Sequence, residues 1–253
     1  MGKTRTIAVA LKKGGVGKTT TAVNLAAGLH KAGKKVLLVD IDPQASATIS
    51  CGIDITTITK SIHNLFKDIT LSPEDVIIKT SFGMDILPAH TDLAQTQAGM
   101  TAASTGELRA LLTPIESNYD YIVIDTPPSE SFLSISALVY ASEILVPVET
   151  HFLSLQGLKQ LLDMVEQVKR GLNPKLQILG LLPTKVHNRT NMSNATLKLL
   201  QEKFPDIVFP INIDFTIQHP QASMAGIPLI LLNPSQAGAV AYSKLADLIM
   251  KKT

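Results

Sequence analysis

The chain has 253 residues, of which 45% are hydrophobic, so it can bury a substantial core, and its formal net charge at pH 7 is only +2. It contains no apolar run of about 18 residues, which excludes a membrane-spanning helix, and its single cysteine, Cys51, excludes an intrachain disulfide or a cysteine metal cluster. The first residues lead directly into an apolar run, so we expect no secretory signal and a cytoplasmic location.

The first stretch that carries chemistry joins a predicted strand at 7–11 to a predicted helix at 21–30. Strand, glycine-rich turn and helix form the setting of a phosphate-binding loop, in which glycines let successive backbone N–H groups point at phosphates. We expect Lys18 to reach the β- and γ-phosphates of a nucleotide and Thr19 to bind Mg²⁺. The predicted nucleotide-binding segment comprises Lys13, Gly14, Gly15, Val16, Gly17, Lys18, Thr19 and Thr20.

Lys13 distinguishes this loop from the standard one, because the first glycine falls one residue late and Lys13 stands directly before it. A lysine at this place can hardly curl back onto the phosphates that its own loop surrounds, and it is better placed to reach a nucleotide held by a second copy. The string at 13–20 resembles the deviant Walker A loop of the ParA/MinD ATPase superfamily. The resemblance implies a homodimer that sandwiches ATP, with Lys13 acting catalytically in trans beside Lys18.

Two acids follow the next predicted strand, at 35–40. Ligands of open α/β sheets bind beyond the carboxyl ends of the strands, so Asp40 and Asp42 should arrive at the phosphates. We expect Asp40 to hold the water shell of Mg²⁺ and Asp42 to orient the attacking water, although either acid could instead cap a helix or a turn. With Pro43 and Gln44 they form a string that resembles switch I of ParA-type partition ATPases.

Residues 51–118 show no pattern that indicates chemistry; helices are predicted at 58–66, 93–98 and 105–115, and short strands at 76–78 and 84–88. The apolar run at 119–124 then delivers Asp125, followed by Thr126-Pro127-Pro128. A carboxylate at the tip of a buried strand is a Walker B arrangement, so we expect Asp125 to bond a Mg²⁺-bound water. This segment resembles switch II of the same family.

The remaining pattern continues to alternate between strands and helices. Strands are predicted at 143–148, 176–184 and 207–213, with a long helix ending near residue 172 and a last helix at 235–252. The predicted fold class is therefore α/β, a single P-loop NTPase domain over residues 1–253 with a mostly parallel, twisted sheet and helices on both faces. The family's strand ending Pro-Arg-Asn-Val matches Pro210 and Asn212, which the resemblance places in the adenine pocket.

The resemblance also implies non-specific binding to double-stranded DNA. Residues 1–158 hold 12 Lys and Arg against 15 Asp and Glu, whereas residues 159–253 hold 11 against 6. This basic third could face a polyanion, although solvated helix faces explain the charge equally well. Asp214 and Gln236 stand where the family often has basic residues, so DNA contacts must use other groups. The candidates are Lys185, Arg189, Lys198, Lys203, Lys244, Lys251 and Lys252.

The resemblance implies a ParA-type ATPase that uses ATP and Mg²⁺, dimerises on ATP, associates with the nucleoid and segregates a plasmid or chromosome or positions another cargo. Its hydrolysis would be stimulated by a ParB-like or other cargo adaptor protein, and no stable membrane association is expected. One alternative is a MinD-like positioning ATPase at the membrane. The other is a synthetase that uses ATP to activate a carboxylate.

Overall fold

The computed structural model describes residues 3–151, 154–187 and 190–252. In these residues one eight-stranded sheet has the order β3-β4-β2-β5-β1-β6-β7-β8, parallel throughout except for the antiparallel β3–β4 pair. The strands are β1 Arg5–Val9, β2 Val36–Asp40, β3 Ile78–Lys79, β4 Asp85–Leu87, β5 Tyr121–Asp125, β6 Glu143–Glu149, β7 Gln177–Val186 and β8 Ile213–Asp214.

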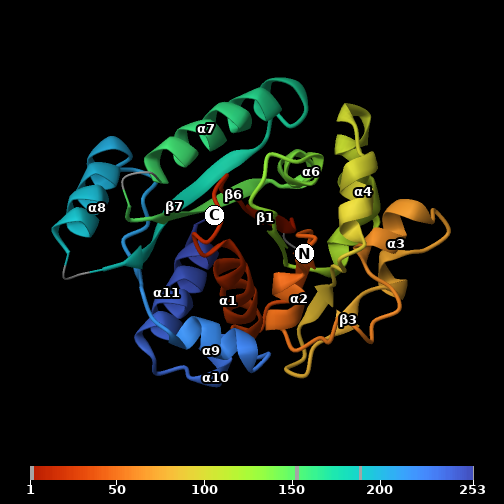
Figure 1. The fold of residues 1–253 in the computed structure, drawn as a ribbon, viewed down its shortest axis with the longest axis horizontal. Coiled ribbons are helices and arrows are strands. Elements are labelled where there is room, and N and C mark those ends of the chain that lie inside the picture. Colours follow the sequence, from red (N-terminus) through yellow and green to blue (C-terminus); the bar gives the residue numbers. More distant parts are fainter. Residues whose placement is uncertain (1–2, 152–153, 188–189, 253) are drawn as a thin grey trace.

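Helices cover both faces of the sheet, and Figure 1 shows the two layers on either side of it. One layer contains α1 Lys18–Lys31, α2 Ser46–Ser50, α9 Gln218–Met224, α10 Leu229–Leu232 and α11 Ala237–Lys251. The other contains α3 Ile62–Lys67, α4 Leu93–Gly99, α5 Glu107–Leu112, α6 Phe132–Tyr140 and α7 Ser154–Gly171, with α8 Asn191–Lys203 beside β7. Three short 3₁₀ helices, η1 Pro73–Asp75, η2 Ala102–Gly106 and η3 Thr113–Asn118, join these elements. The predicted α/β fold with a mostly parallel sheet is confirmed.

Helix α1 is the centre of its layer because it is made of small residues. Ala22, Ala26 and Ala27 are fully buried. A methyl group added at Gly28 would lie 3.1 Å from the Ile230 side chain of α10 and 3.2 Å from Ala246 of α11. This close approach fixes α1 directly behind β1, and it therefore fixes the loop between them.

The strand order brings the predicted acids together. Strands β2 and β5 are neighbours, and their register pairs Asp40 with Asp125. The loop after β1 lies beside them, since β1 pairs with β5. The carboxyl ends of β1, β2 and β5 thus form one edge of the sheet, where open α/β proteins bind ligands.

Four predicted elements differ from the structure, and one of them, the helix expected at 58–66, begins only at Ile62. The strand expected at 207–213 is reduced to a bridge at Val208 and the two residues of β8, since Pro210 has no N–H to donate to a ladder. The helix expected at 105–115 is broken into η2, α5 and η3, and Pro114 is the second residue of η3. The strand expected at 76–78 begins only at Ile78.

In the described part of the chain, no helix is both long and apolar enough to cross a bilayer.

Candidate functional site

The loop between β1 and α1 curls around its own first turn. Gly15 and Gly17 have φ of 73° and 92°, values that side-chain-bearing residues rarely adopt. Lys18 opens α1, is 6% exposed and donates a hydrogen bond of 2.8 Å from Nζ to the carbonyl oxygen of Lys13. Burial lowers the pKa of Lys18, and the carboxylates of Asp125 and Asp42 act in the opposite direction. A buried ammonium bonded only to a loop carbonyl is ready to accept an anion.

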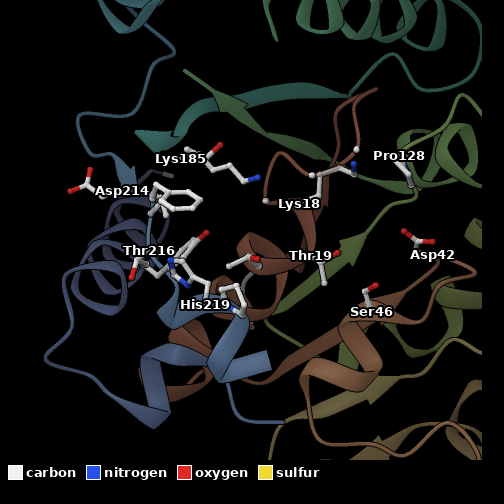
Figure 2. Close-up of a pocket in the computed structure, with 18 residues that line it drawn as sticks. Lys18, Thr19, Asp42, Ser46, Pro128, Lys185, Asp214, Thr216 and His219 are labelled. Carbon is white, nitrogen blue, oxygen red and sulfur yellow. The ribbon is translucent and has the colours of Figure 1, made fainter. Parts of the chain in front are cut away.

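A cavity of about 420 Å³ opens over this loop (Figure 2). It is bounded by the loop, by the segments after β2 and β5, by the end of β7 and by the segment from β8 into α9. Its lining consists of Gly14, Gly15, Gly17, Lys18, Thr19, Thr20, Asp42, Ser46, Pro128, Thr184, Lys185, Ile213, Asp214, Phe215, Thr216, His219, Pro220 and Tyr242. Val16 is fully buried, and its carbonyl oxygen accepts a hydrogen bond of 2.8 Å from the Thr184 hydroxyl.

Asp40 and Asp125 are fully buried next to each other. Asp40 accepts hydrogen bonds from the backbone N–H of Asp42 at 3.1 Å and from the N–H and hydroxyl of Thr48 at 2.8 Å. Among the described residues, no hydrogen bond reaches either carboxylate oxygen of Asp125. Burial and the Asp40 carboxyl raise the pKa of Asp125 well above its usual value. Thr19 and Lys18 act in the opposite direction and lower this pKa, but by less. Burial also raises the pKa of Asp40, to about 6.

This pair of carboxyls is suited to a cation. Two neighbouring buried acids, one of them without hydrogen-bond partners, are costly unless a positive charge compensates them. Mg²⁺ is usually bound through one or two protein oxygens together with substrate phosphates and waters. Among the described residues there is no group of three or more His, Cys, Asp or Glu that could hold a metal alone. Thr19, Asp125 and Asp40 therefore fit the predicted set of metal-binding residues at this edge of the sheet. Asp40 also holds α2 in place through its hydrogen bonds with Thr48.

Asp42 lines the cavity and lies on a tight turn. Its Oδ1 accepts a hydrogen bond of 2.9 Å from the N–H of Gln44, and its carbonyl oxygen accepts one of 2.8 Å from Ala45. Ala45 has a left-handed φ of 51°, an unusual conformation for alanine that the turn requires. The side chain of Asp42 is held at the cavity by this turn, which suits the predicted role of orienting a water.

Lys13 belongs to the loop but is not among the cavity-lining residues. Its Nζ forms an ion pair of 2.8 Å with Oε2 of Glu149, at the end of β6. About a third of the Lys13 side chain is exposed to solvent. The Lys13 ammonium thus contacts Glu149 and is not part of the lining of the cavity.

The far end of the cavity is formed by residues that the sequence analysis did not identify. They are Phe215, Thr216, His219, Pro220 and Tyr242. Pro210 and Asn212 are not part of this lining, so the prediction that they bind adenine has no support from the cavity. The signal that could have located the far end is Phe215, an aromatic residue directly after the β8 segment.

The far end has two pairs of packed rings, each containing one histidine. Phe215 is 54% exposed and stacks on His187, with ring centroids 4.8 Å apart. His219 lies edge-on to Tyr242, and neither of its ring nitrogens has a hydrogen-bond partner among the described residues. Burial lowers the pKa of His219, which therefore stays neutral.

The candidate DNA-binding lysines are dispersed. Lys198 and Lys203 lie on α8, where Lys198 forms an ion pair of 3.7 Å with Glu202. Lys244 and Lys251 lie exposed on α11. Lys252 donates a hydrogen bond of 3.1 Å to the Leu179 carbonyl and lies over the Phe209 ring.

Two further candidates for DNA binding are Lys185 and Arg189. Lys185 lines the cavity and points into it, so its candidate contact with DNA stays a prediction (Figure 2). Arg189 lies outside the described residues.

Comparison with known proteins finds a matching family and several relatives of this chain. A family described as an AAA domain matches residues 4–178. The chain is 38% identical over 242 residues to the sporulation initiation inhibitor protein Soj of Bacillus subtilis, covering 95% of this chain and 96% of that protein. It is 35% identical over 253 residues to the chromosome partitioning protein ParA of Caulobacter vibrioides, covering 98% and 94%.

Two solved structures have the same fold. Cobyrinic acid a,c-diamide synthase from Mycobacterium smegmatis, with bound ADP and magnesium, has a TM-score of 0.85 and 33% identity over 98% of this chain and 94% of its own. A McdA variant from Cyanothece in complex with ATP has a TM-score of 0.86 and 25% identity, over 98% and 97% of the two chains.

Proposed function

The chain belongs to the ParA and Soj family of partition ATPases, and on that premise we propose that it dimerises on ATP, binds DNA non-specifically and segregates or positions a cargo. It is a nucleotide-hydrolysing enzyme whose cofactors are ATP and Mg²⁺. The observation that carries the proposal is the separation of two lysines of one loop. Lys18 lines the cavity, whereas Lys13 does not.

The residues of the cavity can perform the chemistry of hydrolysis. The loop N–H groups and Lys18 bind the phosphates, and Thr19, Asp125 and Asp40 would hold the metal. Mg²⁺ neutralises charge that develops on the transferred phosphoryl group. Asp42, fixed by its turn in the lining of the cavity, would orient the attacking water.

Dimerisation would complete the site. A second amine from Lys13 of the partner would stabilise the negative charge of the transition state, as an arginine finger does. Lys13 is suited to this role because its side chain is partly exposed and lies outside its own cavity. A monomer lacks this group at its phosphates, so turnover without a dimer would be slow.

DNA binding would use the basic C-terminal third. Helices α8 and α11 carry these exposed lysines, and both helices lie on the β7 side of the molecule in Figure 1. Contacts of lysines with phosphates carry no sequence information and weaken steeply with salt. A ParB-like or other adaptor would stimulate hydrolysis and release the dimer from DNA, which would place the protein on the nucleoid.

A second candidate is a synthase that activates a carboxylate. It is suggested by the similarity of this chain to the protein called cobyrinic acid a,c-diamide synthase. Such an enzyme needs its second substrate beside the γ-phosphate. A second cavity, of about 480 Å³, is lined by His30, Lys35 and Lys79 among others, at the opposite edge of the sheet from the loop. It cannot hold a substrate next to the phosphates, so we favour the partition function.

The proposal is tested by DNA binding to a random-sequence duplex with ATP, with ADP and without nucleotide, across a salt series. We expect binding with ATP alone, with log affinity falling linearly against log salt concentration. Equal binding in the three nucleotide states, or none with ATP at low salt, would overturn it. Sedimentation with anionic liposomes and ATP tests the MinD-like alternative in parallel.

A further inference from the structure

Lys185 occupies a bulge at the carboxyl end of β7. The pairing of β7 with β8 joins Thr184 to Ile213 and Val186 to Asp214, so that Lys185 is the extra residue between them. Its φ of 50° is in the left-handed region, which lysine rarely adopts. Bulges of this kind redirect a side chain and are frequent beside active sites.

The residues on both sides of Lys185 hold the bulge in place. The Thr184 hydroxyl donates to Val16 in the phosphate-binding loop at 2.8 Å, and the Thr184 carbonyl accepts from the N–H of Thr150 at 3.2 Å. Val186 is 2% exposed, and its carbonyl accepts from the N–H of Phe215 at 3.1 Å. The unfavourable backbone conformation is therefore imposed by the surroundings, and such conformations cluster at functional sites.

The bulge directs the ammonium of Lys185 into the nucleotide cavity. Its Nζ lies 3.9 Å from the position that a Cβ would take at Gly15. Figure 2 shows the side chain extending from β7 across the cavity toward the loop that carries Lys18. Two amines from separate elements thus approach the loop whose N–H groups face the phosphates.

We propose that Lys185 is a nucleotide-binding residue whose ammonium contacts an α- or β-phosphate oxygen of the bound nucleotide, and that it does not contact DNA. The inference rests on the nucleotide-binding part of the proposed function and is independent of dimerisation and DNA binding. An ammonium beside Gly15 is within reach of an anion cradled by the loop, because the loop wraps the α- and β-phosphates.

The test measures ADP affinity by calorimetry, with Mg²⁺, in four variants. Lys185→Met removes the charge, Lys185→Arg keeps it, and Lys185→Gly removes it without straining the left-handed backbone. Lys175→Met is the matched control, since Lys175 is an exposed lysine outside the cavity. The midpoint of thermal unfolding without nucleotide confirms that each variant is folded, and Lys185→Gly should not lower it.

We expect Lys185→Met and Lys185→Gly to weaken ADP binding about tenfold or more, as loss of a hydrogen bond to a charged group does. Lys185→Arg should retain most of the affinity, and Lys175→Met all of it. The salt dependence of DNA binding should be the same in Lys185→Met and the wild type.

Unchanged ADP affinity in Lys185→Met would overturn the proposal, and so would an equal loss in Lys185→Arg. A DNA salt slope reduced by about one unit would return Lys185 to the DNA surface. Failure of the wild-type chain to bind DNA would count against the proposed function alone, since ADP binding is measured without DNA.

Discussion

Lys13 and Glu149 form an ion pair of 2.8 Å that ties the start of the phosphate-binding loop to the end of β6. The pair holds the Lys13 side chain away from the cavity while the Lys13 carbonyl accepts a hydrogen bond from Lys18. Lys13 thus positions Lys18 through its backbone carbonyl, while its own ammonium contacts Glu149. A trans role for Lys13 requires that the contact with Glu149 be exchanged for a contact with the partner's phosphates.

Glu149→Gln should therefore favour the ATP-bound dimer. A partly exposed ion pair contributes at most about 1 kcal/mol. Dimerisation exchanges two such pairs, one in each protomer, so the dimer dissociation constant should fall by up to about thirtyfold. Sedimentation equilibrium with ATP and Mg²⁺ measures it. Glu130→Gln is the matched control, since Glu130 pairs at 2.6 Å with the neighbouring Lys12. A weaker dimer in Glu149→Gln would contradict the interpretation.

Lys18→Ala should abolish nucleotide binding, because it removes the buried ammonium that faces the cavity. An uncompensated loss of a charged hydrogen bond to phosphate should reduce ADP affinity by at least about tenfold. Isothermal titration with Mg-ADP checks this. Lys12→Ala should bind normally, and retained tight binding in Lys18→Ala would remove the loop from the nucleotide site.

Asp42→Ala should preserve ADP binding and ATP-dependent dimers but reduce turnover by about a hundredfold or more, since the attacking water loses its orienting carboxylate. Steady-state phosphate release and sizing together separate these effects. Asp54→Ala is a suitable control, because Asp54 accepts a hydrogen bond of 2.9 Å from Thr56 in a similar turn outside the cavity. Normal turnover in Asp42→Ala would exclude Asp42 from the mechanism.

The stability of the fold should respond to His219. Burial depresses its pKa below the ordinary 6.5, so below that pH the unfolded chain binds a proton that the folded chain does not. The stabilisation is complete above about pH 6.5 and is lost as the pH falls toward the folded-state pKa.

His219→Phe isolates this contribution, since Tyr242, Lys185 and Asp214 around the same cavity remain. The raised carboxyl pKa values of Asp40 and Asp125 act in the opposite direction, but equally in both proteins. Urea unfolding across this pH range should show wild-type stability falling relative to His219→Phe as the pH decreases. A difference independent of pH would contradict the assignment.

The sequence was sufficient to predict the glycine-rich loop between β1 and α1 and the meeting of Asp40 and Asp125 at one end of the sheet. Lys18, Thr19 and Asp125 are carried by local strings, and the parallel pattern of buried strands brings their ends together. Local patterns do not determine partners that are distant in sequence. The pairing of Lys13 with Glu149 spans 136 residues and depends on β1 lying beside β6.

The far end of the cavity could not be predicted for a related reason. The position of Lys185 depends on a bulge created by β8, a strand of only two residues. The string around Pro210 suggested a longer strand, but the ladder is interrupted there, and the lining comes from the segment after β8, including Phe215 and His219. Pairing between strands that are distant in sequence sets these positions. Secondary-structure propensity and motif spacing therefore cannot predict them.

The account depends most directly on Lys13 acting across a dimer, and a mixing experiment tests it. Lys13→Ala and Asp42→Ala should each hydrolyse ATP poorly alone. In a mixed dimer, the Lys13→Ala protomer keeps its own Lys18 and Asp42 and receives Lys13 from its partner. We predict that phosphate release reappears on mixing, and that it does not when the partner carries both substitutions. A mixture no more active than its separate components would show that Lys13 acts within its own chain, and would contradict the account.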